Sequence, residues 1–151
     1  MLLKASRQHA RHRARLLLCT CISSHYENRR TKLAALAASF PGCDGVAKGG
    51  CMQNYVGQLL SSEFVASPRG ISVGNFRDVE AVLMGAVPIV DDFPPLSSLW
   101  DNVPVLRVQG NWGSLTPAKL EQQLEHWLAN TDFTYSISKA FLPYWLAQLR
   151  L

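Results

Sequence analysis

Residues 64–92 read FVASPRGISVGNFRDVEAVLMGAVPIVDD, and this stretch decides the fold. It begins with a short apolar run at 64–67 and ends with a second one at 87–90, as expected of strands buried on both faces. Between the two runs lie a Pro-Arg-Gly turn, a glycine-bearing loop and a helix predicted at 77–84, which stops at Gly85. The stretch therefore predicts a strand, a loop, a helix and a second strand.

The same alternation continues on both sides of this unit. The other predicted elements are a strand at 15–23, helices at 29–40 and 55–60, a helical turn at 94–102, a strand at 103–108, and helices that begin at 116–117 and near 136. Strands that alternate with helices over short connections imply parallel strands joined by right-handed crossovers. We therefore expect an α/β fold with a small doubly wound parallel sheet.

The charge of the chain is divided unequally along its 151 residues. Residues 1–32 carry eight Lys or Arg and one acid, whereas residues 33–151 carry seven Lys or Arg and ten acids. We expect residues 1–15 to form a basic, poorly ordered leader and residues 16–151 to form one mildly acidic domain. The leader would be simply solvated, or it would touch nucleic acid or an anionic membrane. No apolar stretch approaches the roughly 20 residues of a spanning helix, so no membrane span is expected.

The four cysteines do not have the spacing of zinc ligands, and no metal site is expected. Cys19 and Cys21 lie in the first predicted strand, where a free cysteine behaves as a small buried hydrophobe. A disulfide between Cys43 and Cys51 would close the glycine-rich loop at 41–52 if the compartment is oxidising.

The turn after residue 67 is the strongest candidate for a ligand site, because ligands of open parallel sheets bind at the carboxyl ends of the strands. Gly70 and Gly74 let a ligand approach the backbone. Asn75 is placed to cap the next helix, whose free N–H groups favour an anion. Arg69 lies in the same turn and supplies a cation.

Helical spacing adds Glu80 to this site. Phe76, Val79 and Leu83 fall on one face of the predicted helix, and Glu80 lies close to the edge of that face. A carboxylate near a core face needs a partner, since burial of an isolated charge is costly. The partner is either Arg77 on the same helix or a set of ligand hydroxyls, and both interpretations remain open.

Two other strand ends carry weaker candidates. Ser24 and Arg29 follow the first predicted strand and would meet a diphosphate, or they belong to a plain loop. Asp91 and Asp92 are adjacent, which differs from the D-x-D spacing that chelates a metal for sugar-nucleotide transfer. The chain has no G-x-G-x-x-G, P-loop or G-x-S-x-G motif, which argues against a dehydrogenase, a P-loop NTPase and an α/β-hydrolase.

Taken in order, these motifs resemble the C-terminal half of exostosin-like glycosyltransferases, and ribitol xylosyltransferase-like enzymes are also similar. That family has an apolar strand, Pro-Arg-Gly, a glycine-containing loop, Arg-x-x-Glu-Ala-Leu, a glycine and Ile-Pro-Ile-Val. The matching positions are Pro68, Arg69, Gly70, Arg77, Glu80, Ala81, Gly85, Pro88, Ile89 and Val90. The resemblance covers roughly residues 16–150.

The resemblance implies the Rossmann-like C-terminal half of a GT-B glycosyltransferase located in the Golgi. This half would bind a nucleotide sugar, as substrate and not as cofactor, for transfer to a glycan or glycoprotein. Arg69 and Arg77 would neutralise the diphosphate, and Glu80 would bond ribose or sugar hydroxyls. The remaining donor contacts would come from Ser24, Arg29, Pro68, Gly70, Ser72, Gly74 and Asn75.

Alternatives to transfer by this chain remain. Ser72 and Gly74 stand where the family has a glycine and an aspartate, which favours an inactive nucleotide-binding or interaction module. We expect a fragment that lacks the acceptor half and transfers little sugar by itself. A more distant alternative is a flavodoxin-like receiver domain in which Asp91 or Asp92 is the acidic residue at a strand end. No nucleic-acid partner is expected.

Overall fold

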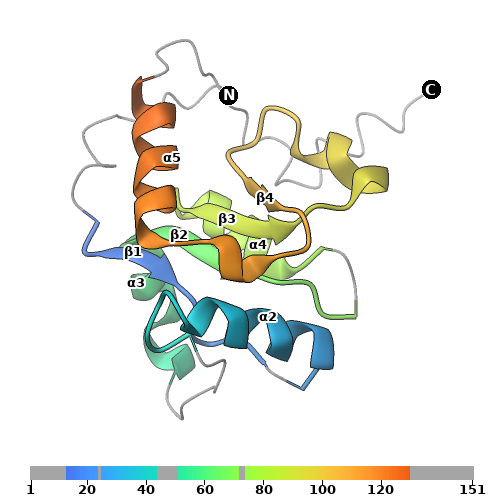
Figure 1. The fold of residues 1–151 in the computed structure, drawn as a ribbon. Helices are drawn as coiled ribbons and strands as arrows, with labels where there is room; N and C mark the ends of the chain where they lie inside the picture. The colour runs from blue at the N-terminus through green and yellow to red at the C-terminus, as the bar shows by residue number, and fades with distance from the viewer. Residues whose placement is uncertain (1–12, 24, 44–50, 72–73, 130–151) are drawn as a thin grey trace, which may run out of the picture.

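The computed structural model describes residues 13–23, 25–43, 51–71 and 74–129, and within them four strands form one parallel sheet (Figure 1). The strands are β1 (Arg15–Leu18), β2 (Ser62–Ser67), β3 (Val87–Asp91) and β4 (Leu106–Val108). They lie in the order β1-β2-β3-β4, so each strand pairs with the next one in sequence. The predicted α/β fold with a parallel sheet is confirmed. The order does not reverse among the described strands, and a doubly wound order stays a prediction.

Helices connect and cover these strands. They are α2 (Glu27–Ala37), α3 (Tyr55–Leu60), α4 (Phe76–Leu83) and α5 (Pro117–Ala129), with 3-10 turns η1 (Cys51–Asn54), η2 (Pro94–Trp100) and η3 (Trp112–Ser114). The predicted helix at 55–60 is confirmed residue for residue, and the helix predicted at 77–84 is displaced by one residue. The predicted cap of α5 is also confirmed, because the Thr116 hydroxyl accepts a hydrogen bond from the Lys119 amide. The helix predicted near 136 lies outside the described residues.

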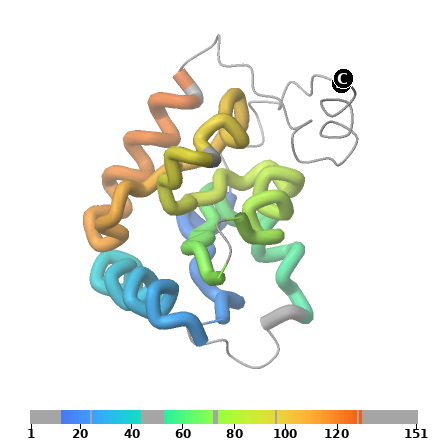
Figure 2. Tube along the Cα trace, turned by 90° about the vertical axis from the view of Figure 1, so that its right-hand side faces the viewer, coloured from blue at the N-terminus to red at the C-terminus, as the bar shows by residue number. Residues whose placement is uncertain are grey.

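The sheet lies between two layers of helices (Figure 2), and a separate hydrophobic cluster fills the space on each of its faces. Helices α2 and α5 cover one face through Leu33, Leu36 and Leu120, whereas α3 and α4 cover the other through Leu59 and Ala81. All six residues of β2 are buried, because the strand is covered on both faces. This double cover explains why the apolar run at 64–67 is continuous and does not alternate with polar residues.

The outer strands are shorter than predicted. The strand predicted at 15–23 ends at Leu18, and the one predicted at 103–108 begins only at Leu106. After β1 the chain turns, and Cys21 has a φ of 61°, which is incompatible with an extended strand. The apolar character of residues 19–22 reflects burial of a turn, which periodicity cannot distinguish from burial of a strand.

The sheet begins inside the segment predicted as the leader. Arg15 is the first residue of β1, and the Arg13 guanidinium donates hydrogen bonds to the carbonyl oxygens of Leu59, Ser62 and Met84. Leu59 and Met84 lie at the ends of α3 and α4, where a cation is favoured by the helix dipole. Residues 13–15 therefore contribute to the fold, and the rest of the predicted leader, 1–12, lies outside the described residues.

A disulfide joins Cys19, just after β1, to Cys43, beyond the end of α2. The two Cα atoms are 5.1 Å apart, and both side chains are buried in the core beneath α2. The predicted pairing of Cys43 with Cys51 is wrong, as is the prediction that Cys19 is a free thiol. Cys51 is closer to Cys43 in sequence, but after α2 the chain comes back beside the end of β1, which brings Cys43 next to Cys19. Among the described helices, none is long and apolar enough to cross a membrane.

Candidate functional site

A crevice lies at the carboxyl ends of β1 and β2 because the chain leaves these neighbouring strands toward opposite faces. After β1 it enters α2 on one face, and after β2 it enters α4 on the other (Figure 1). Divergence of neighbouring loops is what opens a ligand crevice in parallel sheets. The resulting cavity has a volume of about 240 Å³. Its lining consists of Cys21, Ile22, Ser23, Arg29, Tyr55, Ser67, Pro68, Asn75, Arg77 and Glu80.

The structure thus brings five of the predicted site residues to one cavity: Arg29, Pro68, Asn75, Arg77 and Glu80. They come from α2, the turn after β2 and α4, which are separated by up to 51 positions in the sequence.

Arg77 links the two strand ends that form the crevice. Its guanidinium donates hydrogen bonds to the carbonyl oxygens of Ala66 at 2.9 Å, Thr20 at 2.9 Å and Cys21 at 3.4 Å. It also lies over the ring of Tyr55, 5.3 Å from the ring centre. Burial lowers the pKa of this guanidinium, although nearby acidic groups oppose the shift. Arg77 therefore fastens the turn after β1 to β2.

Glu80 accepts a hydrogen bond from the Tyr55 hydroxyl, 2.9 Å from Oε2. Among the described residues it forms no ion pair with Arg77, so the predicted Arg77–Glu80 pair is not what holds this carboxylate. Tyr55 is the partner that sequence reasoning missed. It begins a different helix, 25 positions earlier, and no local spacing connects it with Glu80.

The predicted apolar face of α4 is wrong. Phe76 is 90% exposed, and the residues that α4 buries are Asp78, Ala81 and Val82. Phe76 is the first residue of the helix and projects past the edge of the core, whereas small Ala81 lets the helix approach the sheet closely. Glu80 does lie in the cavity wall, but α4 packs on the sheet in a different orientation from the one that the sequence predicted.

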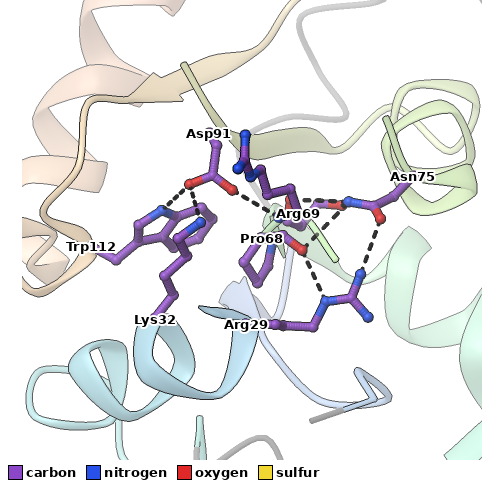
Figure 3. Close-up of polar contacts among 8 residues, drawn as sticks. Arg29, Lys32, Pro68, Arg69, Asn75, Asp91 and Trp112 are labelled. Carbon is purple, nitrogen blue, oxygen red and sulfur yellow. Dashed lines mark hydrogen bonds and ion pairs between the residues drawn. The ribbon is translucent and has the colours of Figure 1, made fainter. Parts of the chain in front are cut away.

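Arg29 joins the loops on the two sides of the crevice (Figure 3). Its guanidinium donates to the carbonyl oxygens of Pro68 at 3.0 Å and Ser23 at 3.3 Å, and to Oδ1 of Asn75 at 3.1 Å. Asn75 is the N-cap of α4, as predicted, and its side chain also accepts a hydrogen bond from Arg29 and donates one to the carbonyl oxygen of Ser67. Arg29 and Asn75 together fix the width of the crevice.

The closeness of these loops depends on Gly70. A Cβ added to Gly70 would lie 2.5 Å from Nη2 of Arg29 and 3.3 Å from the Tyr26 ring. Any larger residue at position 70 would displace the arginine. Gly70 was predicted to let a ligand approach the backbone, and here it is the protein's own arginine that approaches.

Asp91 organises the carboxyl end of β3 (Figure 3). Its Oδ1 accepts a hydrogen bond from Nε1 of Trp112 at 2.9 Å and pairs with Nζ of Lys32 at 2.7 Å, while Oδ2 accepts the amide hydrogen of Arg69 at 2.8 Å. The Lys32 and Asp91 side chains are only 13% and 11% exposed. Asp91 therefore ties together α2, η3 and the turn that carries Arg69, a role that its place at a strand end did not reveal.

Arg69 differs from Arg29 and Arg77 in its side-chain contacts. Its guanidinium stacks over Phe93 at 5.9 Å and makes no hydrogen bond to any residue that the structure describes. It does not line the cavity, although it directly follows Pro68, which does.

Three other residues were predicted to contact a ligand. Gly74 is exposed next to the start of α4. Ser24 and Ser72 fall outside the described residues. Within the described ranges, no three His, Cys, Asp or Glu side chains gather closely enough to hold a metal ion.

Asp78 is a buried carboxylate in the first turn of α4. It is 1% exposed; Oδ2 accepts the amide hydrogen of Asn75, and Oδ1 has no hydrogen-bond partner in the described part of the chain. This hydrogen bond confirms the predicted pairing of the N-cap residue, Asn75, with the residue three positions later. Burial raises the pKa of Asp78 to about 6.

This pKa predicts a pH-dependent stability. Because the folded state binds the Asp78 proton more tightly than the unfolded state, its contribution to stability is complete below about pH 4 and is lost as the pH rises through about 6. The change amounts to roughly 3 kcal/mol. The variant Asp78→Asn cannot titrate at this position. As the pH rises from 4 to 7.5, its free energy of unfolding should therefore increase relative to that of wild type by up to roughly 3 kcal/mol. Urea unfolding at a series of pH values measures the difference.

The matched control is Asp101→Asn, because Asp101 is exposed. As a surface substitution, it should change the free energy of unfolding by less than about 0.5 kcal/mol in the same measurements. A flat difference for Asp78→Asn would show that this carboxyl is not the buried, proton-binding group.

Neither the models of known protein families nor the curated proteins give a match to this chain.

Proposed function

We propose that this domain binds the nucleoside diphosphate of a nucleotide sugar, as the donor-binding half of an exostosin-like GT-B glycosyltransferase that acts on a glycan or glycoconjugate. The observation that carries the proposal is the cavity where the chain leaves β1 and β2 toward opposite faces, with the Glu80 carboxylate in its wall. A carboxylate that is already oriented accepts hydrogen bonds from vicinal hydroxyls, which ribose supplies.

The charges around the crevice suit an anionic ligand. Arg29 and Arg77 line the cavity, Arg69 directly follows Pro68 of the lining, and Glu80 is the one carboxylate among the described lining residues. Arg29 and Arg77 give their hydrogen bonds to protein oxygens, and they contribute mainly charge and shape. Arg69 is the arginine that we assign to the diphosphate. As the bond between sugar and phosphate breaks, its guanidinium would stabilise the charge that develops on the leaving diphosphate.

The size of the cavity limits which part of the ligand it encloses. At about 240 Å³ it is smaller than the roughly 300–1,000 Å³ of pockets that enclose whole ligands. We assign it to the ribose and the adjoining phosphate, with the sugar extending over the rim. A general base for the acceptor would come from outside the described residues, and we expect the isolated chain to transfer little sugar.

The disulfide supports the proposed compartment. Structural disulfides persist in the secretory pathway and are rare in the cytosol. The Cys19–Cys43 bond is buried beneath α2, next to the turn that lines the cavity. This favours the lumen of the secretory pathway, and a Golgi location is the one that the glycosyltransferase proposal implies.

A thermal-shift screen of the purified chain against UDP, GDP, CDP and their sugars tests the proposal. A ligand at 100 times its dissociation constant stabilises by about 2.7 kcal/mol, which raises the melting temperature by several degrees. We expect one diphosphate to produce this shift and Glu80→Ala to abolish it.

The control is Glu121→Ala, since Glu121 is exposed on α5, away from the cavity lining. It should retain the full shift. Absence of any shift, with the chain shown to be folded by circular dichroism, would contradict nucleotide binding.

The second candidate function is an interaction module of the same fold without a working donor site. It is favoured by the hydrogen bonds of Arg29 and Arg77, which are satisfied by protein atoms, and by the small cavity. Sugar transfer or specific nucleotide binding by the purified chain would exclude it.

A further inference from the structure

The hydrogen bond between Tyr55 and Glu80 links two helices at the wall of the cavity. Tyr55 begins α3 and Glu80 lies within α4, two helices that cover the same face of the sheet (Figure 2). The Tyr55 hydroxyl donates to Oε2 of Glu80 over 2.9 Å, and both residues line the cavity. The hydrogen bond therefore connects the two helices at the cavity wall.

This hydrogen bond makes the two carboxylate oxygens unequal. Oε2 is held by Tyr55, whereas Oε1 accepts no hydrogen bond from any residue that the structure describes. A glutamate without such a partner samples several side-chain rotamers, and a ligand would have to select one of them. A glutamate that is held beforehand binds more tightly, because less freedom is lost on association.

The tyrosine is itself well fixed. Its ring is partly buried and supports the guanidinium of Arg77, 5.3 Å from the ring centre. Burial raises the pKa of Tyr55 to about 12, so the hydroxyl remains a donor throughout the neutral range. A phenylalanine at position 55 would keep the support for Arg77 and remove only the bond to Glu80.

We propose that Tyr55 is a positioning residue, which holds Glu80 so that Oε1 accepts a hydrogen bond from a ligand hydroxyl and makes the site selective for ribose over deoxyribose. This inference rests on the proposed function, since it takes Glu80 to contact the ligand. It adds the residue that holds Glu80 in place and the expected discrimination between ribose and deoxyribose.

The test is calorimetric titration of the whole chain and of Tyr55→Phe with UDP, GDP and CDP and with their 2′-deoxy and 3′-deoxy counterparts. A hydrogen bond to a charged group corresponds to about tenfold or more in affinity, so wild type should prefer the ribonucleotide to at least one deoxy form by that factor. Tyr55→Phe should reduce this preference to within about threefold. Glu80→Gln should reduce it similarly, and the double variant should reduce it no further.

The ratio of affinities separates positioning from a merely structural role. If Tyr55 only stabilised α3, Tyr55→Phe would weaken all the nucleotides equally and leave the ratio unchanged, which would overturn the inference. Ser61→Ala is the matched control, because it removes a hydroxyl from the other end of α3, where Ser61 bonds the carbonyl oxygen of Gln58. It should leave the ratio at its wild-type value.

The outcomes also separate this inference from the proposed function. If wild type binds none of the nucleotides, the proposed function fails and the inference fails with it. If wild type binds and discriminates while Tyr55→Phe keeps the full discrimination, only the role of Tyr55 is refuted. If wild type binds without discrimination, recognition of a hydroxyl by Glu80 is refuted.

Discussion

Replacing Asp91 by alanine should lower the free energy of unfolding by about 3–5 kcal/mol, as expected when one partner of a buried ion pair is removed. The loss leaves three donors without their acceptor: Nζ of Lys32, Nε1 of Trp112 and the amide of Arg69. Lys32 is only 13% exposed, so its ammonium group cannot regain full hydration without a change in packing. Urea unfolding at pH 7 measures the effect.

The neighbouring aspartate provides the control. Asp92 accepts a hydrogen bond from Gln109, and its ion pair with Arg107 spans 4.0 Å to a side chain that is 44% exposed. Asp92→Ala should cost no more than about 1 kcal/mol. A double variant, Asp91→Asn with Lys32→Met, should regain part of the loss, because it removes the unpaired buried charge. Equal costs for Asp91→Ala and Asp92→Ala would contradict the central role of Asp91.

Replacing Arg77 by methionine should cost on the order of 3 kcal/mol, because the carbonyl oxygens of Ala66, Thr20 and Cys21 lose their donors together. Methionine keeps much of the apolar stem, so the loss in free energy of unfolding measures the contribution of the guanidinium. Arg77→Lys should recover little of it, since a single ammonium group cannot reproduce the planar fork that reaches the ends of both strands. Urea unfolding of the three proteins measures the series.

Arg107→Met is the control for a general effect of removing an arginine. Arg107 is exposed on β4, and its replacement should change the free energy of unfolding by less than about 0.5 kcal/mol. Full recovery by Arg77→Lys would show that charge alone is needed and that the three-way hydrogen bonding of Arg77 is not.

The sequence predicts this fold well where the signal is local. Gly85 ends α4 with a φ of 71°, as the glycine after the helical pattern indicated. The Thr116-Pro117 pair starts α5, and the apolar runs at 64–67 and 87–90 are adjacent parallel strands. Each of these predictions depends on residues within a few positions of each other.

Predictions that depend on distant partners were less successful. The approach of α4 to the sheet is set by Ala81 and Val82, and a pattern that weights large apolar residues instead selects Phe76. The contact between Tyr55 and Glu80 joins two helices. The Lys32–Asp91 ion pair joins a helix to a strand end 59 positions later, and nothing in the local sequence of either residue indicates it.

The strand order has a consequence for how the protein is made. Each strand pairs only with its neighbours in sequence, and synthesis releases the chain from its N-terminus. Every new strand therefore finds its partner already synthesised, and no later segment has to insert between two strands that have paired. Cys43 also emerges before β2, so the Cys19–Cys43 bond can close while the rest of the sheet is still being translated. The sheet can thus be assembled one strand at a time, from β1 to β4, in the order of translation.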